Sequence, residues 1–293
     1  MRKVLIIIPL IIPLFFLFSC SSHKTNEKSD IITVSISPFA FFIDRIGGED
    51  FQINIMVPPG SDPHIYEPYP SQVAALSNSA AYISNGLLDF EIAWLEKFYS
   101  VNSKMKKLNL ADSVDLIITE DHGHGINADP HFWLAPLSAM KIASSVKWLL
   151  CEIKPERKDK YEQNYFLLID SIQAIHNKAL RLLTPFAGKP VFVYHPTLGY
   201  LARDYGFVQI SIEKEGKEPS PSWLKEVVDK ILENNIGAVF VQKEFDKRNA
   251  EVIAGETGTR IIEISTLSRD WFSDINKLID CIYLSFTDKQ IIK

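Results

Sequence analysis

Several features that would narrow the function of this 293-residue chain are missing from it. The charge shows no basic excess, since 31 lysines and arginines face 36 aspartates and glutamates, and this excludes the electrostatic footprint of a nucleic-acid-binding protein. There is no His-Glu-x-x-His pair and no serine or cysteine nucleophile in a recognisable turn, so the common hydrolase signatures are absent. Beyond residue 18, no apolar run reaches the roughly 20 residues that a membrane-spanning helix needs. The informative features are the N-terminus, the alternation of strand and helix patterns, and the histidines.

The first 20 residues are typical of a bacterial lipoprotein signal. Two basic residues precede the apolar run Val4–Phe18, which at about 15 residues is short for a spanning helix but suits the core of a signal peptide. Ser19 then stands directly before Cys20, as in a lipobox. We therefore expect residues 1–19 to be removed and Cys20 to be lipidated. The alternative is an ordinary signal peptide followed by an unmodified cysteine.

Residues 20–30 form a polar segment that predicts a flexible tether between the lipid and the folded part. Removal of residues 1–19 takes two of the 31 basic side chains and no acid, so 29 basic side chains face 36 acidic ones, a net charge of −7. The other two cysteines are Cys151 and Cys281. An oxidising compartment would preserve a bond between them, and two buried free thiols are the other interpretation.

Strand and helix patterns alternate through the rest of the chain. Predicted strands lie at 31–36, 51–57, 81–84, 191–194, 207–212, 238–241 and 260–264. Predicted helices lie between them at 38–46, from 70, and at 89–100, 198–205, 221–234, 246–257 and 270–286. Such alternation is typical of βαβ units with a parallel sheet covered by helices. The sequence therefore predicts an α/β protein with two Rossmann-like lobes.

One helical pattern is much longer than the others. From Pro155 to Leu183 no glycine or proline follows the first residue, and apolar residues recur every three or four positions. About 28 residues of helix measure roughly 42 Å, which suggests a rigid connector, although a surface helix within one domain would show the same pattern. The expected division is an N-terminal lobe at 31–153, a connecting helix at 154–185 and a C-terminal lobe at 186–293. A ligand site is expected in the cleft between the lobes.

Three of the seven histidines share one local setting. His64, His131 and His195 each adjoin a proline in a turn at the end of a predicted strand or loop. They are 67 and 64 residues apart, so only the fold can bring them together. Three imidazoles with an open or carboxylate fourth position form a common shell for Zn2+, and other late first-row metals also accept imidazole. His23, in the tether, and His176, on the long helix, are expected to have no part in it.

The segments around these histidines form an ordered set. Residues 58–68 read PPGSDPHIYEP and residues 129–136 read DPHFWLAP, with further matching segments at 194–206, 212–221 and 239–258. The set resembles the signature segments of zinc/manganese solute-binding proteins of bacterial ABC transporters, and it runs from about residue 31 to 287. In that family two α/β lobes are joined by one long helix, with the metal between the lobes.

The resemblance implies that His64, His131 and His195 are metal ligands. It also implies that the chain captures Zn2+, with Mn2+ as the alternative, and delivers it to the ABC permease of a metal importer. Manganese-selective relatives commonly carry a carboxylate at the position of His195, so a histidine there favours zinc. The implied location is extracytoplasmic, in the periplasm or at the cell surface, as a lipoprotein anchored by its N-terminal lipid alone. We expect a monomer.

The fourth metal ligand is the one departure from the family pattern. The family usually places an aspartate after the last strand, where this chain has Ser265. A neutral hydroxyl is a poor Zn2+ ligand. The fourth position is therefore left to water or to a nearby acid, and Glu67, Glu213 and Asp270 are the candidates, either as the ligand itself or as a partner of a ligand.

A short loop before the second histidine segment also favours metal. Residues 120–125 read EDHGHG, so acids, glycines and the histidines His122 and His124 alternate. Zinc-type relatives carry a histidine-rich loop at this place, which predicts an auxiliary collector of zinc. A polar solvent loop that happens to hold two histidines is the other interpretation.

Two other functions are compatible with parts of the sequence. A zinc-dependent hydrolase would also use three protein ligands and a water, but Pro68 directly follows Glu67 and argues against the helix that a catalytic His-Glu motif needs. A surface adhesin lipoprotein is the third possibility, as a second role. The sequence favours a metal-binding protein that is not an enzyme.

Overall fold

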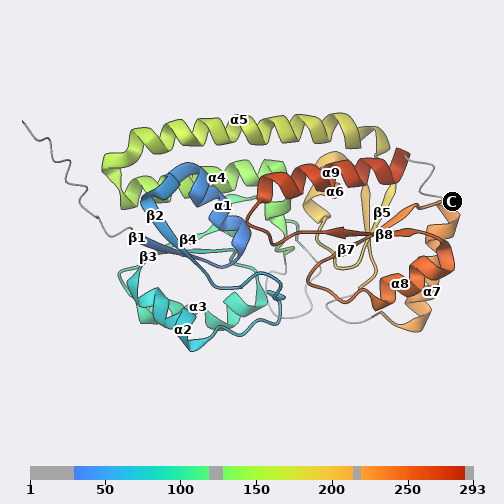
Figure 1. Cartoon of the computed structure of the whole chain (residues 1–293), viewed down its shortest axis with the longest axis horizontal. Helices are drawn as coiled ribbons and strands as arrows, with labels where there is room; N and C mark the ends of the chain where they lie inside the picture. The colour runs from blue at the N-terminus through green and yellow to red at the C-terminus, as the bar shows by residue number, and fades with distance from the viewer. Residues whose placement is uncertain (1–29, 119–127, 214–218, 288–293) are drawn as a thin grey trace, which may run out of the picture.

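The computed structural model describes residues 30–118, 128–213 and 219–287, which form two α/β lobes side by side (Figure 1). Each lobe is built on a four-stranded sheet in which every described pairing is parallel. The predicted fold class is thereby confirmed. The expectations for the signal peptide, Cys20 and the loop histidines His122 and His124 concern residues outside the described ranges, as does the tether except for its last residue, Asp30, which begins a strand.

The N-terminal lobe carries the sheet order β2-β1-β3-β4. Its strands are β1 (Asp30–Val34), β2 (Phe51–Ile55), β3 (Ser79–Ser84) and β4 (Lys106–Asn109). Its helices are α1 (Ser37–Gly47), α2 (Pro70–Ala75), α3 (Asp89–Val101) and α4 (Pro136–Ile153). In register, Val34 of the central strand β1 pairs with Ile55 on one side and Ile83 on the other. The 18-residue helix α4 and the strand β4 were not among the predicted elements.

The C-terminal lobe repeats the same order, as β6-β5-β7-β8. Its strands are β5 (Pro190–Val193), β6 (Val208–Ser211), β7 (Ala238–Gln242) and β8 (Arg260–Ile264). Its helices are α6 (Gly199–Tyr205), α7 (Pro221–Glu233), α8 (Arg248–Thr257) and α9 (Trp271–Thr287). Ser220 begins α7 as a true cap, since its side chain accepts a hydrogen bond from the Trp223 amide. Gly258 ends α8 in the left-handed conformation that glycine adopts most easily.

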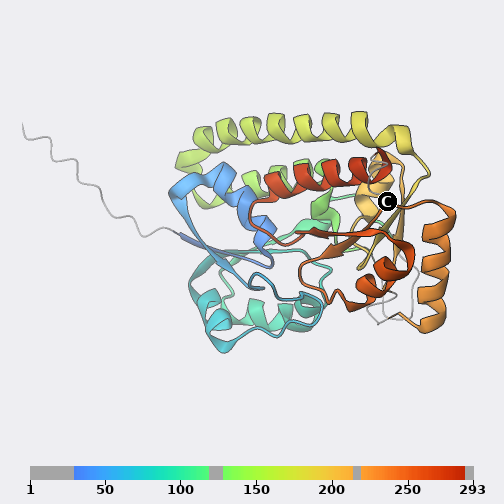
Figure 2. The same ribbon diagram turned by 45° about the vertical axis from the view of Figure 1, so that its right-hand side comes forward.

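The 26-residue helix α5 (Lys158–Leu183) runs along one side of both lobes (Figures 1 and 2). A separate 3-10 turn at Pro155–Arg157 precedes it, so the α-helix begins three residues later than predicted. Its buried side is an apolar stripe at helical spacing, and it packs against α1, α4 and α9. No helix in the described ranges has the length and apolarity required to cross a membrane. Cys151 and Cys281 are both free thiols.

Two tryptophans join the lobes behind the cleft. The indole N–H of Trp133, in the N-terminal half, donates to the carbonyl of Thr266 at 2.9 Å, and that of Trp271 donates back to the carbonyl of Trp133 at 2.7 Å. Arg269 adds two hydrogen bonds to Asp44, both at 2.7 Å. Both indoles are at most 2% exposed. The loop between β8 and α9 is therefore fixed to the opposite lobe, which restricts movement of one lobe against the other.

Candidate metal centre

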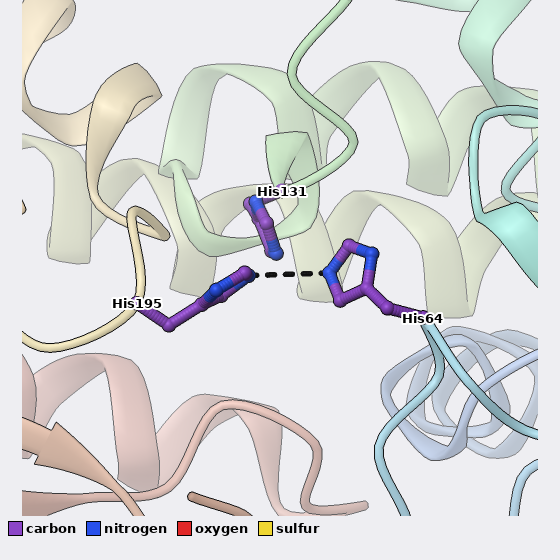
Figure 3. Close-up of side chains that lie close together, drawn as sticks. All are labelled: His64, His131 and His195. Atoms are coloured by element: carbon purple, nitrogen blue, oxygen red, sulfur yellow. Dashed lines mark hydrogen bonds between the residues drawn. The ribbon is translucent and has the colours of Figure 1, made fainter. Parts of the chain in front are cut away.

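His64, His131 and His195 meet between the two lobes (Figure 3). His64 lies on the loop between β2 and α2, His131 directly precedes the 3-10 turn Phe132–Leu134, and His195 follows β5. One nitrogen from each ring falls within a span of 4.8 Å, and the Nε2 atoms of His64 and His195 are 3.2 Å apart. The fold thus brings together the three side chains that the sequence singled out.

Each ring is held from behind by a carboxylate. The Nδ1–carboxylate pairs are His64–Asp89 at 2.9 Å, His131–Asp129 at 2.8 Å and His195–Glu213 at 3.1 Å. A neutral imidazole that donates its Nδ1–H keeps its lone pair on Nε2. The carboxylates therefore select the tautomer that aims Nε2 at the shared point, an arrangement that commonly orients metal-binding histidines.

The tripeptide Asp-Pro-His occurs twice and builds a similar turn each time. The amide of His64 donates to Asp62 Oδ1 at 2.8 Å, and that of His131 donates to Asp129 Oδ1 at 2.8 Å. In the second turn the same carboxylate also holds the imidazole, whereas the ring of His64 is held by Asp89, at the start of α3. The repeated tripeptide is a signal in the sequence for Asp129, but nothing local points to Asp89.

His195 is fixed by the ends of the two central strands of its sheet. Its amide donates to the Gln242 side-chain oxygen at 3.2 Å, and the Gln242 side-chain nitrogen donates to the His195 carbonyl at 2.7 Å. Gln242 is fully buried, and the Phe245 ring stacks on the imidazole with centroids 4.6 Å apart. This ring is therefore positioned before any ion arrives.

The histidines differ in their affinity for protons. Burial lowers the pKa of His131 to about 4 against the opposing effect of Asp129, so this ring is neutral near pH 7. Burial also lowers the pKa of His64, but the hydrogen bond to Asp89 and the charges of Asp62 and Asp89 outweigh it, and the pKa of His64 is raised. Protons therefore compete with a metal at His64 well before they do so at His131.

Two cavities flank the histidine cluster. A larger one of about 440 Å³ is lined by the three rings and by apolar side chains that include Leu87 and Ile92. A smaller one of about 10 Å³ is lined by the three rings together with Glu244 and the loop after β8. The smaller volume is about that of one water molecule or one ion.

The acids considered for the fourth position lie in different places. Glu213 is buried behind His195 and contacts its Nδ1, so it is a partner of that ring. Asp270 accepts a hydrogen bond from the Ser273 amide at the start of α9, and Glu67 is exposed; neither lines a described cavity that contains the histidines. Ser265 lines a separate cavity with Lys243 and Cys281.

The prediction missed Glu244. It lies two residues beyond β7, where no motif marks it, and it lines the small cavity with the histidines. His176, by contrast, lies on α5 with its Nδ1 3.1 Å from the hydroxyl of Tyr205 and takes no part in the cluster.

Two parallel-sheet lobes, a long helix alongside both and a histidine cluster between them define a class of metal-binding proteins. The family described as "Zinc-uptake complex component A periplasmic" matches residues 32–282, and the chain belongs to this family. Its members are the solute-binding proteins of metal ABC transporters, and they are not enzymes.

Individual relatives agree with this assignment. The chain is 24% identical over 275 residues to the zinc-binding lipoprotein AdcA of Streptococcus pneumoniae serotype 4, a match that covers 89% of this chain and 54% of AdcA. It is 27% identical to the metal ABC transporter substrate-binding lipoprotein SloC of Streptococcus mutans serotype c, over 89% of this chain and 88% of SloC. The chain thus spans about half the length of AdcA and most of SloC. A crystal structure of ZnuA superposes with a TM-score of 0.82 at 36% identity, over 88% of this chain and 99% of that one.

Proposed function

We propose that this chain captures Zn2+ for an ABC importer and that His64, His131 and His195 bind the ion through their Nε2 atoms. The observation that carries the proposal is the set of three Nε2 atoms turned to one point, each ring held by a carboxylate on its Nδ1. Pre-oriented imidazoles avoid the cost of ordering ligands when the ion binds.

Zinc is preferred over manganese because the cluster is made of imidazoles. Mn2+ is better suited by carboxylate, carbonyl and water oxygens, whereas imidazole suits Zn2+. The names of relatives differ on this point: AdcA is named for zinc, and MtsA of Streptococcus pyogenes serotype M6 for iron. The donor set of this chain, not the names, supports zinc.

The ion enters a site whose protein parts are already in place. His131 is neutral near pH 7 and needs no deprotonation, while His64 must give up any proton that Asp89 helps it to hold. The tryptophan and Arg269 contacts behind the cleft leave little freedom for a lobe to swing. Release to the permease is therefore expected to follow local movement of the site loops when both lobes dock.

The same proposal includes the location of the chain. Relatives such as SloC are named as substrate-binding lipoproteins of metal ABC transporters. Together with the lipobox-like Ser19-Cys20, this supports an extracytoplasmic protein held at a membrane by a lipid on Cys20 and paired with a metal permease. Labelling with an alkyne fatty acid should mark the wild-type chain and leave Cys20→Ala unmarked; equal labelling of both would reject the anchor.

The metal proposal is tested by titration of the chain that begins at Ser21. We expect one Zn2+ per chain, with tighter binding than Mn2+, and a loss of affinity of at least about 100-fold in each of His64→Ala, His131→Ala and His195→Ala. His176→Ala is the matched control, because it removes a half-buried histidine from outside the cluster and should leave the affinity unchanged. Preference for Mn2+ would overturn the zinc assignment, and tight binding that survives all three substitutions would overturn the site.

A further inference from the structure

Among the residues that the structure describes, Glu244 is the one acid that lines the small cavity with all three histidines. Its backbone is fixed beside the site, because the Phe245 amide donates to the Gln242 carbonyl at 3.2 Å and the Phe245 ring stacks on His195. The cavity has room for about one ion or water molecule. Glu244 is therefore held beside the small space that separates it from the three imidazoles.

One of the two carboxylate oxygens of Glu244 lacks a hydrogen-bond partner in the described residues. Its Oε2 atom is buried and makes no hydrogen bond there. By contrast, the carboxylates of the two buried glutamates have partners: Glu91 accepts hydrogen bonds from Tyr82 and two amides, and Glu213 contacts His195. Burial and the charges of Asp62 and Glu263 raise the pKa of Glu244, against the opposing effects of its own amide and of Lys243. A half-buried carboxylate with an unpaired oxygen gains from a cation beside it, and the histidine cluster across the cavity is where one would bind.

We propose that Glu244 is the fourth ligand of the bound metal and completes a shell of three imidazoles and one carboxylate. The proposal rests on the proposed function. The carboxylates behind the three rings do not touch the ion, and the imidazoles themselves are neutral, so Glu244 would bring the first negative charge into direct contact with Zn2+ in a site where His131 and His195 are almost fully buried. The oxygens of Glu244 lie outside the 4.8 Å span of the histidine nitrogens, so the side chain rotates toward the ion on binding.

The same geometry explains how this chain can lack an acid at Ser265. That residue faces a different cavity, with Lys243 and Cys281, and the loop that carries it is fixed by the hydrogen bond from Trp133 to Thr266. A carboxylate supplied from the loop after β7 replaces one from the loop after β8. Metal affinity is then set by a residue that the family resemblance did not indicate.

A thiolate at position 244 gives a direct test of coordination. Glu244→Cys, loaded with Co2+ in place of Zn2+, should show a sulfur-to-cobalt charge-transfer band, because a coordinating thiol is deprotonated and bonds the metal. Ser265→Cys is the matched control at the position expected from the family, and it should show no band above that of the unsubstituted chain. A band in Ser265→Cys and none in Glu244→Cys would overturn the proposal.

Zinc affinity provides the second measurement, by competition with a chromophoric chelator. Glu244→Gln should bind Zn2+ about 10- to 100-fold more weakly while its circular dichroism is unchanged. Glu263→Gln removes a nearby exposed carboxylate that is paired with Lys247, and it should change the affinity less than twofold. This control separates loss of a ligand from loss of negative charge near the site.

The outcomes separate the two proposals. If the unsubstituted chain binds no Zn2+, the proposed function fails and the fourth ligand fails with it. If that chain binds one Zn2+ and Glu244→Gln binds it equally well, the site stands and Glu244 is rejected. Should Glu244→Cys fail to fold, the zinc affinity of Glu244→Gln decides the matter alone.

Discussion

The two lobes share one strand order but not one kind of core. In the N-terminal lobe, both faces of the sheet belong to the main apolar cluster, which continues through α1, α4, α5 and α9. In the C-terminal lobe, the two faces of the sheet belong to different apolar clusters. Val191 and Val193 of β5 join the main cluster, while the alternate residues Phe192 and Tyr194 belong to a smaller one under α7 and α8. One lobe is thus continuous with the connecting helices, and the other carries a layer with a core of its own.

This difference bears on the metal site. His64 and His131 come from the lobe that is continuous with the main core, and His195 follows β5, the strand whose two faces belong to different clusters. We expect the outer layer of α7 and α8 to open more readily than the main core, because these helices pack on a smaller cluster of their own. The loop that carries Glu244 connects β7 to α8 and so adjoins this outer layer.

The largest effect is expected where the lobes are joined. Trp271→Ala should lower the free energy of unfolding by about 3–5 kcal/mol, because it removes a buried indole and leaves the Trp133 carbonyl without its donor. Chemical denaturation measures this loss. Trp148→Ala, which truncates a 62% exposed indole on α4, is the matched control and should change stability by no more than about 0.5 kcal/mol. Equal losses in the two variants would show that the tryptophan contacts do not join the lobes.

A somewhat smaller effect is expected at Glu91 in the N-terminal lobe. This carboxylate accepts hydrogen bonds from Tyr82 and from the amides of Asn85 and Gly86, and the Asn85 side chain in turn donates to the Pro130 carbonyl beside His131. Glu91→Ala leaves these buried donors without an acceptor and should cost about 2–3 kcal/mol.

The stability contributed by Glu91 should also depend on pH. Burial raises its pKa from 4.5 to about 7, so the folded chain binds more protons than the unfolded chain between those values. The free energy of unfolding therefore falls as pH rises through this window, and Glu91→Ala should flatten that slope. Denaturation at pH 5 and pH 8 tests this; an unchanged slope in the variant would assign the pH dependence to other groups.

Sequence patterns predicted the alternation of elements and the three histidines because both depend on local signals, apolar periodicity and a proline next to each ring. They missed α4 and β4. Residues 136–153 form a helix whose apolar residues are spread too broadly to mark one clear face in the sequence. The short edge strand β4 begins with the exposed Lys106 and Lys107, so its sequence does not look like a buried strand. The carboxylate partners were missed for another reason. Asp89 is 25 residues from His64, and their meeting follows from the strand order, which no local pattern encodes.

The partner of His64 allows a test on a smaller scale. Asp89→Asn should weaken Zn2+ binding about 10-fold at pH 8, because a neutral amide oxygen accepts more weakly from Nδ1–H and no longer increases the basicity of Nε2. The same change lowers the pKa of His64, which Asp89 raises, so protons displace zinc from the variant only at lower pH. The difference in affinity between the two chains should therefore narrow as pH falls to 6. A gap that stays constant between pH 8 and pH 6 would mean that His64 does not set the pH dependence.

The smallest effect is expected in the outer layer of the C-terminal lobe. Ile253 of α8 is fully buried in the smaller cluster, and Ile253→Val should lower stability by only about 0.5–1.5 kcal/mol. The informative result is which part of the chain loses stability. If the two clusters are energetically separate, amide hydrogen exchange should quicken in α7 and α8 and stay unchanged in α5, whereas Ile172→Val on α5 should act on both lobes together. Equal acceleration throughout the chain in both variants would show that the molecule opens as one unit, and that the site loop carrying Glu244 is no freer than the rest.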